Sequence, residues 1–271
     1  MTSSRVVISG AFDDLRPPNF RFLSEAAKLG KVLALLWSDD AIKKLTGKTP
    51  KFPHQERLYL LESVRYIDKA IIINETTPEI LLQFKPEIWA VDEQNDNAQN
   101  EAFCNANKIK YKVLKNSVLN SFPDYVPDFK KTVSARKKVI VTGCYDWFHS
   151  GHVRFFEEAS QLGDLYVCIG SDRTIAQLKG PGHPLIPQQQ RWFVVQSIKF
   201  VKQTLISTGF GWLDAEPEMR RLEPDIYVVN EDGDKPEKRE FCRAHGLEYV
   251  VLKRAPKAGL PRRQSTDLRG F

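Results

Sequence analysis

The sequence has 271 residues, of which 42% are hydrophobic, 27% charged and 11% aromatic, and its formal net charge is +6 at pH 7. This length suits one large or two ordinary domains, and the composition excludes low-complexity and disordered chains. No run reaches the roughly 20 apolar residues of a membrane-spanning helix, and the first residues lack the pattern of a secretory signal, so we expect no membrane insertion.

Residues 5–30 begin with a β-branched run typical of a strand, which is followed by a loop and by a segment of helical periodicity. The same pattern returns over residues 138–163, at a constant offset of 133 residues. Later segments match too, such as KPEIWAVDEQ from Lys85 and EPDIYVVNED from Glu223. The chain is therefore read as two copies of one module.

Strand and helix patterns alternate along each copy, which predicts two tandem α/β domains of the Rossmann-like, doubly wound kind, each with a parallel sheet. Residues 118–137 contain prolines and a basic run without periodicity and are expected to form a linker. The expected organisation is a degenerate first domain over residues 1–117, the linker, and a catalytic domain over residues 138–271. In such folds, ligands bind beyond the carboxyl ends of the strands.

The four cysteines form no CxxC pair and lie in apolar or helical stretches, which indicates reduced thiols in a cytoplasmic protein and argues against a structural zinc site. The basic excess is concentrated near the C-terminus. Residues 250–271 carry six lysines and arginines against a single acidic residue, Asp267. Such a tail suits a small polyanion, and no motif or aromatic-interleaved basic stripe favours nucleic acid.

The two copies differ in the loop after their first strand. The second copy has His149-Ser150-Gly151-His152 where the first has Arg16-Pro17-Pro18-Asn19. At a helix start, His149 and His152 lie on one face, Gly151 leaves room for a phosphate, and the helix N-terminus adds a positive partial charge. The loop is therefore predicted to be a polyphosphate cradle with two imidazole donors.

The second copy resembles the HxGH nucleotidyltransferase superfamily, which contains cytidylyltransferases and adenylyltransferases. Three elements carry this resemblance: the loop from Gly143 to His152 with Tyr145 in the family's Phe position, the pair Lys179-Gly180, and an arginine followed by Ser265-Thr266. Either Arg254 or Arg263 fills the place of that arginine. The first copy lacks the histidine loop and any counterpart of Ser265-Thr266, so it is expected to be non-catalytic and to cover its partner as an intramolecular pseudo-dimer.

The resemblance implies transfer of a nucleoside monophosphate from a triphosphate to a small phosphorylated acceptor, with release of pyrophosphate and with Mg²⁺ bridging phosphates. His149, His152 and Lys179 would be catalytic. The implied nucleotide-binding residues are Gly143, Cys144, Tyr145, Asp146, Gly151, Arg191, Asn230, Asp234, Arg254, Arg263, Ser265 and Thr266; no metal ligand is assigned. For Arg191 an ion pair at a helix start competes with the phosphate role, and for Asn230 and Asp234 a solvated loop does.

Two donor triphosphates stay open. The run STDLRG is typical of cytidylyltransferases of phospho-alcohols, whereas LKGPGHPLIPQQQR is typical of adenylyltransferases of heptose phosphate, and CTP is preferred over ATP by a narrow margin. The acceptor is expected to be a phospho-alcohol, polyol phosphate or sugar phosphate. A non-catalytic nucleotide-binding protein and a homo-oligomeric assembly remain alternatives.

Overall fold

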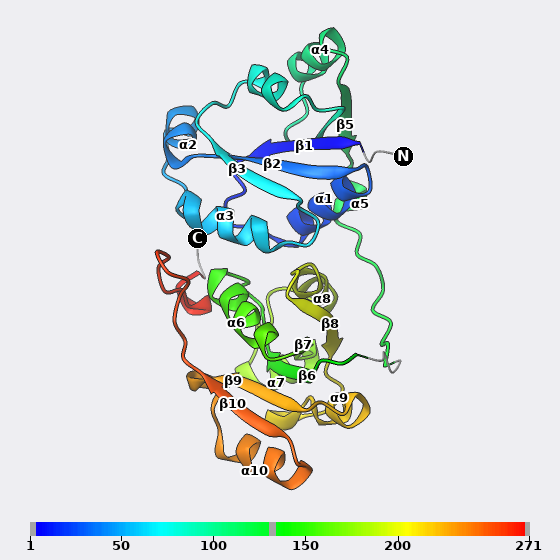
Figure 1. The fold of residues 1–271 in the computed structure, drawn as a ribbon, viewed down its shortest axis with the longest axis vertical. Coiled ribbons are helices and arrows are strands. Elements are labelled where there is room, and N and C mark those ends of the chain that lie inside the picture. The colour runs from blue at the N-terminus through cyan, green and yellow to red at the C-terminus, as the bar shows by residue number, and fades with distance from the viewer. Residues whose placement is uncertain (1–3, 130–133, 269–271) are drawn as a thin grey trace. The chain divides into compact units, whose positions relative to one another are not determined.

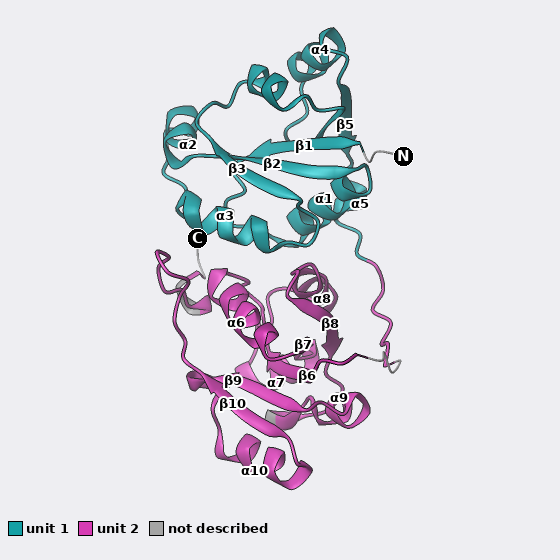
Figure 2. Cartoon of the chain, viewed as in Figure 1, with its two compact units in different colours: residues 1–122 teal, residues 123–271 magenta. Residues whose placement is uncertain are grey.

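A computed structural model describes residues 4–129 and 134–268, apart from the side chains of Trp212, Thr266 and Asp267. The chain divides into two compact units, residues 1–122 (unit 1) and residues 123–271 (unit 2), coloured separately in Figure 2. In the described part of the chain, no helix combines the length and the apolar character needed to cross a membrane.

Unit 1 contains a five-stranded parallel sheet in the order β3-β2-β1-β4-β5 (Figure 1). Its elements are β1 (Arg5–Gly10), α1 (Pro17–Ala27), β2 (Lys31–Trp37), α2 (Asp39–Thr46), α3 (His54–Ser63), β3 (Lys69–Ile73), η1 (Pro78–Phe84), β4 (Ile88–Asp92), α4 (Ala98–Ala106), β5 (Lys110–Leu114) and α5 (Asn116–Leu119).

Unit 2 repeats this order with its own strands, as β8-β7-β6-β9-β10, again all parallel. Its elements are β6 (Lys138–Gly143), α6 (Ser150–Gln161), β7 (Asp164–Ile169), α7 (Asp172–Lys179), α8 (Gln188–Gln196), β8 (Val201–Ile206), η2 (Gly211–Leu213), α9 (Glu216–Leu222), β9 (Ile226–Asn230), η3 (Glu231–Gly233), α10 (Pro236–His245), β10 (Glu248–Leu252) and η4 (Ser265–Leu268). The doubly wound fold class predicted from the sequence is confirmed.

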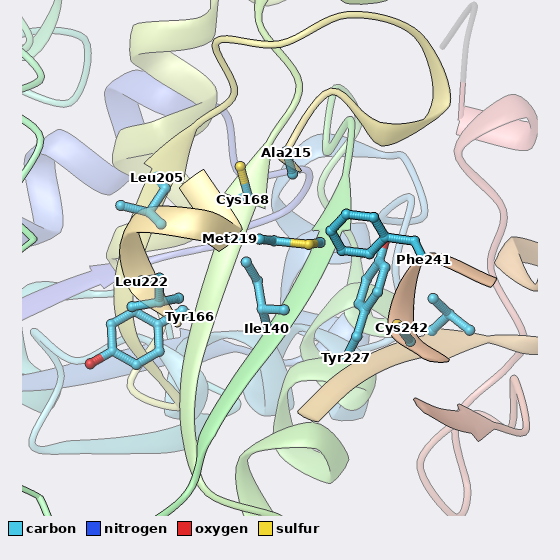
Figure 3. Close-up of a cluster of buried hydrophobic side chains, with 11 residues drawn as sticks. Ile140, Tyr166, Cys168, Leu205, Ala215, Met219, Leu222, Tyr227, Phe241 and Cys242 are labelled. Carbon is cyan, nitrogen blue, oxygen red and sulfur yellow. The ribbon is translucent and has the colours of Figure 1, made fainter. Parts of the chain in front are cut away.

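The strands of unit 2 contribute side chains to the core on both faces of the sheet, because successive side chains of a strand point to opposite faces. Figure 3 shows one face, where Ile140, Tyr166 and Tyr227 of the sheet pack against Met219 of α9 and Phe241 of α10. Val139 and Val141 alternate with Ile140 along β6 and are completely buried as well. This core fixes the strand ends from which the functional loops start.

The segment expected to be a linker is partly docked. Tyr125 lies edge-on to Trp192 with ring centroids 5.6 Å apart, and the guanidinium of Arg221 lies 3.9 Å over the ring of Phe129. These aromatic contacts hold residues 125–129 against the rest of unit 2, although the segment has neither helical nor strand periodicity.

The order of the strands also fixes where a ligand site can form. In both sheets the winding reverses between the first strand and its neighbour across the centre, which is β4 in unit 1 and β9 in unit 2. Loops leave these two strands in opposite directions, so a crevice opens beyond their carboxyl ends.

Candidate active site

A cleft of about 360 Å³ occupies this position in unit 2, beyond the ends of β6 and β9. The structure brings eleven of the sequence-predicted site residues into its lining: Gly143, Cys144, Tyr145, Asp146, His149, Gly151, His152, Lys179, Asn230, Arg254 and Ser265. They come from β6, the following loop, both ends of helices and the C-terminal segment, so the fold gathers residues more than 100 positions apart.

The loop after β6 is shaped by a tight turn at its start. Tyr145 has a positive φ of 54°, and its buried ring lies so close to Gly143 that a Cβ there would be 2.7 Å from the ring. The same ring packs against His152 and Phe156, each with centroids 5.2 Å away. Gly143 and Tyr145 thus position the histidine loop by packing.

Asp146 fixes the other side of the loop. Its buried carboxylate accepts hydrogen bonds from the backbone N–H groups of Leu185 and Ile186, at 3.0 and 2.8 Å. These bonds tie the histidine loop to the segment that follows α7. Both oxygens being engaged, Asp146 acts here as a structural clamp.

His149 and His152 stack on each other with ring centroids 3.9 Å apart. His149 precedes α6, and its Nδ1 accepts from the N–H of Gly151 at 3.0 Å; Nδ1 of His152 lies 3.3 Å from the N–H of His149. A Cβ on Gly151 would lie 2.9 Å from the His149 ring, so glycine is required for this close approach.

These backbone contacts define the protonation of both imidazoles. Since Nδ1 accepts, the proton of each neutral ring resides on Nε2. Burial and the neighbouring Arg254 and Arg263 lower the pKa of His149 to about 3, and burial and His149 lower the pKa of His152 well below its ordinary value. The pair therefore presents neutral N–H donors at physiological pH.

The C-terminal segment closes one side of the cleft. The hydroxyl of Ser265 lies 3.4 Å from Nε2 of His149, and Arg254 donates to the backbone carbonyl of Arg263 at 3.3 Å while pairing with Asp232. Arg254 lines the main cleft, whereas Arg263 lines a narrow adjoining space with Lys253 and Lys257. Both arginines thus lie near His149, which leaves them with a shared electrostatic role.

Lys179 and Lys238 approach the cleft from the end of α7 and the first turn of α10. Lys179 is exposed, while Lys238 is half-buried and burial lowers its pKa. Lys238 was not predicted from the sequence, which indicated Asn230 and Asp234 as the binding residues of the segment after β9. The missed signal is the position of Lys238 just inside the helix that begins at Pro236, where its side chain returns to the strand ends.

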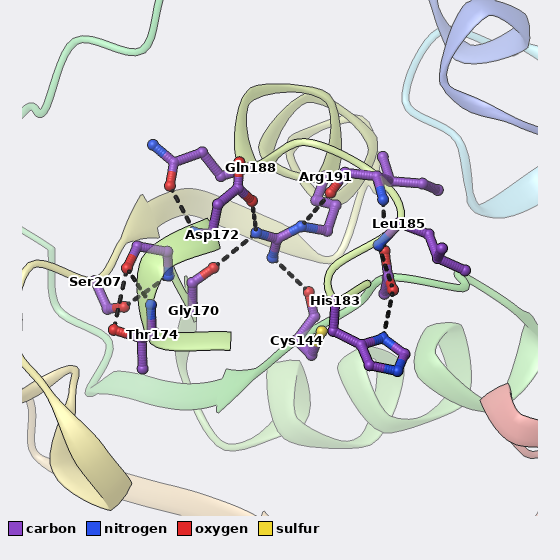
Figure 4. Close-up of polar contacts among 12 residues, drawn as sticks. Cys144, Gly170, Asp172, Thr174, His183, Leu185, Gln188, Arg191 and Ser207 are labelled. Carbon is purple, nitrogen blue, oxygen red and sulfur yellow. Dashed lines mark hydrogen bonds and ion pairs between the residues drawn. The ribbon is translucent and has the colours of Figure 1, made fainter. Parts of the chain in front are cut away.

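Arg191 is not part of the cleft lining. Its side chain is fully buried, and it donates to the carbonyls of Ile186, Cys144 and Gly170 at 2.7–2.9 Å and to the Asp172 carboxylate at 2.7 Å (Figure 4). The expected direct phosphate role is replaced by a positioning one, because no face of the guanidinium is open to a ligand.

Unit 1 contains the same arrangement without the histidines. Arg57 donates to the carbonyls of Phe52, Ala11 and Trp37 and to the Asp39 carboxylate, as Arg191 does to the corresponding groups. Asp13 accepts from two consecutive backbone N–H groups as Asp146 does. These two side chains therefore serve the loop framework in both units.

Two other predicted binding residues are placed differently. Asp234 pairs with Arg239 and accepts from the Tyr249 hydroxyl at 3.1 Å, outside the cleft lining. A contact between Asp234 and a nucleotide stays a prediction. Thr266 belongs to η4 next to Ser265, but the hydroxyl contact expected of it falls outside the described side chains.

A second pocket of about 180 Å³ adjoins the cleft and shares five lining residues with it: Thr142, Gly143, Cys144, Lys179 and Lys238. Its own lining is mostly apolar, with Asp214 as the acidic group. Burial raises the pKa of Asp214, whose carboxylate accepts from the Ser207 hydroxyl at 2.6 Å. The site thus has a cationic, polar part beside a smaller, mostly apolar one.

The described residues contain no group of three or more His, Cys, Asp or Glu side chains arranged to hold a metal ion. The donors lining the cleft are mainly imidazole, ammonium and guanidinium groups, while Asp232 offers one carboxylate beside Arg254. Magnesium typically retains water and phosphate ligands and needs one or two carboxylates. A magnesium ion carried by a polyphosphate would find the carboxylate of Asp232 in this lining.

Comparison with known proteins adds a family to this geometry. Residues 140–260 match a family model described as cytidylyltransferase-like. FAD synthase of Ferroglobus placidus is 34% identical over 122 residues, covering 43% of this chain and 75% of that protein, and FAD synthase of Methanocella paludicola is 33% identical over 119 residues, covering 43% and 81%.

The bifunctional protein HldE of Alcanivorax borkumensis is 32% identical over 117 residues, covering 42% of this chain and 24% of that protein. The match therefore spans about a quarter of HldE. Among solved structures, a lipopolysaccharide core biosynthesis protein from Thermoplasma volcanium is similar at 26% identity and a TM-score of 0.37, covering 42% of this chain and 95% of that one.

The lowered histidine pKa values predict that His149 and His152 do not titrate between pH 5 and 8 in the free protein. As pH falls below about 6.5, the unfolded chain binds protons that the folded histidines refuse, so the pair makes folding less favourable towards pH 3. NMR titration of the imidazole signals, assigned with His149→Gln and His152→Gln, measures this. A midpoint near 6.5 for either ring would contradict it.

The contacts of Arg191 predict a stability effect larger than that of an exposed arginine. Arg191→Met should lower the free energy of unfolding by about 2 to 4 kcal/mol, because three carbonyls lose their donor in a poorly solvated place. Arg239→Met, which removes an exposed ion pair, should cost less than about 1 kcal/mol. Urea unfolding of both variants tests the difference, and equal small losses would refute the positioning role.

Proposed function

The chain belongs to the cytidylyltransferase-like family of nucleotidyltransferases, and from this premise we propose that unit 2 transfers a nucleoside monophosphate from a triphosphate to a phosphorylated acceptor. The observation that carries the proposal is the pair of neutral, stacked imidazoles at the start of α6, surrounded by Lys179, Lys238 and Arg254. Neutral imidazole donors among cationic side chains can stabilise negative charge that develops during the reaction, and they bind a permanently charged anion less tightly than an entirely cationic set would.

The reaction needs no covalent intermediate on the protein. An oxygen of the acceptor phosphate attacks the α-phosphorus and forms a new P–O bond, while the bond to the bridging oxygen breaks and its electron pair leaves with pyrophosphate. Catalysis then rests on alignment and on stabilising charge at the α-phosphate and the leaving oxygen. The Nε2–H groups of His149 and His152 are assigned to these oxygens.

The remaining groups position the triphosphate. The N-terminus of α6 adds its partial positive charge, and Lys179 and Lys238 attract phosphate oxygens from two sides of the cleft. Ser265, Thr266 and Arg263 are proposed to hold the β- and γ-phosphates, since the C-terminal segment already contacts His149. Arg254 would exchange part of its pairing with Asp232 for the phosphates.

Magnesium would neutralise part of the triphosphate charge, held by phosphate oxygens, water and Asp232. The two histidines are poor candidates for holding the ion, since both Nδ1 atoms accept backbone N–H groups and both Nε2 atoms carry protons. They stay available as donors.

ATP is proposed as the donor and CTP as the alternative. The product in the name of the relatives, FAD, contains an adenylyl group, which favours ATP. The run from Ser265 to Leu268 favours CTP and keeps CTP as the alternative. The part of the acceptor that carries no phosphate is proposed to enter the adjoining pocket. There Asp214 can accept hydrogen bonds from hydroxyl groups, and Thr174 can accept or donate them.

The first functional prediction concerns the two histidines. His149→Ala and His152→Ala should each lower kcat at least about a hundredfold, because each removes a donor aimed at developing charge. His245→Ala is the matched control, since His245 is exposed on α10 and donates or accepts only locally with Phe241. Near-normal kcat in both cleft variants, at unchanged stability, would refute the assignment.

The donor and acceptor are tested by pyrophosphate release. The full chain is mixed with each of ATP, CTP, GTP or UTP, with Mg²⁺, and with a panel of sugar, polyol and amino-alcohol phosphates and FMN. Release should depend on both an acceptor and ATP, or on CTP if the alternative holds. Binding of triphosphate without release for any acceptor would instead favour the non-catalytic, nucleotide-binding alternative.

A further inference from the structure

Unit 1 retains a cleft of about 350 Å³ beyond the carboxyl ends of β1 and β4, nearly the volume of the cleft in unit 2. It lies where the winding of the unit 1 sheet reverses, which is the usual ligand position in this kind of fold. A unit that had become a purely structural partner would not need to keep this space open.

About half of the lining of the unit 2 cleft has a counterpart at the matching position in unit 1. Gly10, Ala11, Phe12 and Asp13 stand where Gly143, Cys144, Tyr145 and Asp146 stand, Asn19 replaces His152, Phe22 replaces Phe155, and Asp92 replaces Asn230. Even the cap is preserved, because the Asn19 side-chain oxygen accepts from the N–H of Arg16 at 2.7 Å, as Nδ1 of His152 accepts from His149. The frame is the same and the chemistry has changed.

The change removes positive charge. Among the described residues, no lysine, arginine or histidine lines the unit 1 cleft, whereas Asp13 and Asp92 both line it. Arg16, which follows Leu15 of the lining, and Lys51, whose N–H donates to Asp13, are paired with Asp14 at 2.7 and 3.1 Å. Phosphate binding is further weakened because α1 begins with Pro17 and Pro18, which have no N–H group to donate.

What remains suits an uncharged ligand with an aromatic and a hydroxylated part. Phe12, Phe22 and Trp37 supply aromatic surface in the lining. Oδ1 of Asp92 is engaged by Asn95 at 2.9 Å, and its second oxygen stands at the end of β4, where a carboxylate can accept from a pair of ribose hydroxyls. Asn19 and Gln94 add amide groups.

We propose that unit 1 binds a nucleoside, not a nucleotide, in this cleft, with Asp92 accepting from the ribose hydroxyls and the aromatic side chains contacting the base. The site discriminates against phosphate by charge, which is the reverse of the preference assigned to unit 2. The inference stands apart from the function proposed for unit 2, because every group that carries it belongs to unit 1.

Hydrogen exchange of the full chain, followed by mass spectrometry, tests the site locally. Adenosine and cytidine are titrated, and protection is measured in peptides covering residues 9–22 and 88–97, which report on unit 1 alone. One of the two nucleosides should slow exchange there, and its monophosphate should need at least about ten times higher concentration. Absence of protection at millimolar nucleoside, or equal protection by the monophosphate, would overturn the proposal.

Two variants locate the contact. Asp92→Ala should raise the apparent dissociation constant at unit 1 at least tenfold, while Glu62→Ala, an equal change of charge on the exposed side of α3, should leave it unchanged. Asp92→Asn keeps the size of the side chain in case the alanine variant misfolds, and it should narrow the difference between nucleoside and monophosphate. Unchanged binding in both Asp92 variants would exclude the assigned contact.

Discussion

The buried guanidinium of Arg191 is the constraint on which the active site depends. It joins the loop after β6 through Cys144, the end of β7 through Gly170, the start of α7 through Asp172 and the approach to α8 through Ile186. A planar group with donors in fixed directions can satisfy acceptors on four segments at once, which an ammonium group cannot. The histidine loop and the Lys179 helix are consequently held relative to one rigid point. Asp146 adds a second tie between the same loop and the segment before α8.

Fold and loop could be read from the sequence because both depend on local patterns. Runs such as Val139–Val141 followed by helical periodicity specify a strand and its crossover helix, and the spacing of His149 and His152 places both rings on one face of α6. The role of Arg191 could not be read in this way, since its acceptors lie at positions 144, 170, 172 and 186. Lys238 was missed for the same reason, because it reaches the cleft only through packing of α10. The repeat nevertheless held a clue: Arg57 stands at the matching place in the copy that has no histidine loop.

The side chains that line the cleft carry more positive than negative charge, with Lys179, Lys238 and Arg254 against Asp146 and Asp232. Burial lowers the pKa of both imidazoles, Arg254 lowers it further for both and Arg263 for His149, and Arg254 itself pairs with Asp232. A polyanion in this space would reverse the influence of the arginines on the rings, because the charge of the ligand would offset theirs. By linkage, a polyanion bound in this cleft would raise the pKa of the imidazoles, and protonation of the imidazoles would strengthen its binding.

Arg57 and Arg191, which hold equivalent places in the two units, also bear on which residues of each cleft can differ. In each unit the arginine and the aspartate that support the loop bind mostly backbone carbonyl and N–H groups, and the aspartate also lines the cleft. Substitution of lining residues other than this aspartate should leave the support in place, since most of its hydrogen bonds are with the main chain. Such a scaffold lets one copy lose histidines and gain prolines while its strands and crevice persist. The same kind of support therefore carries two crevices with different linings, one in each unit.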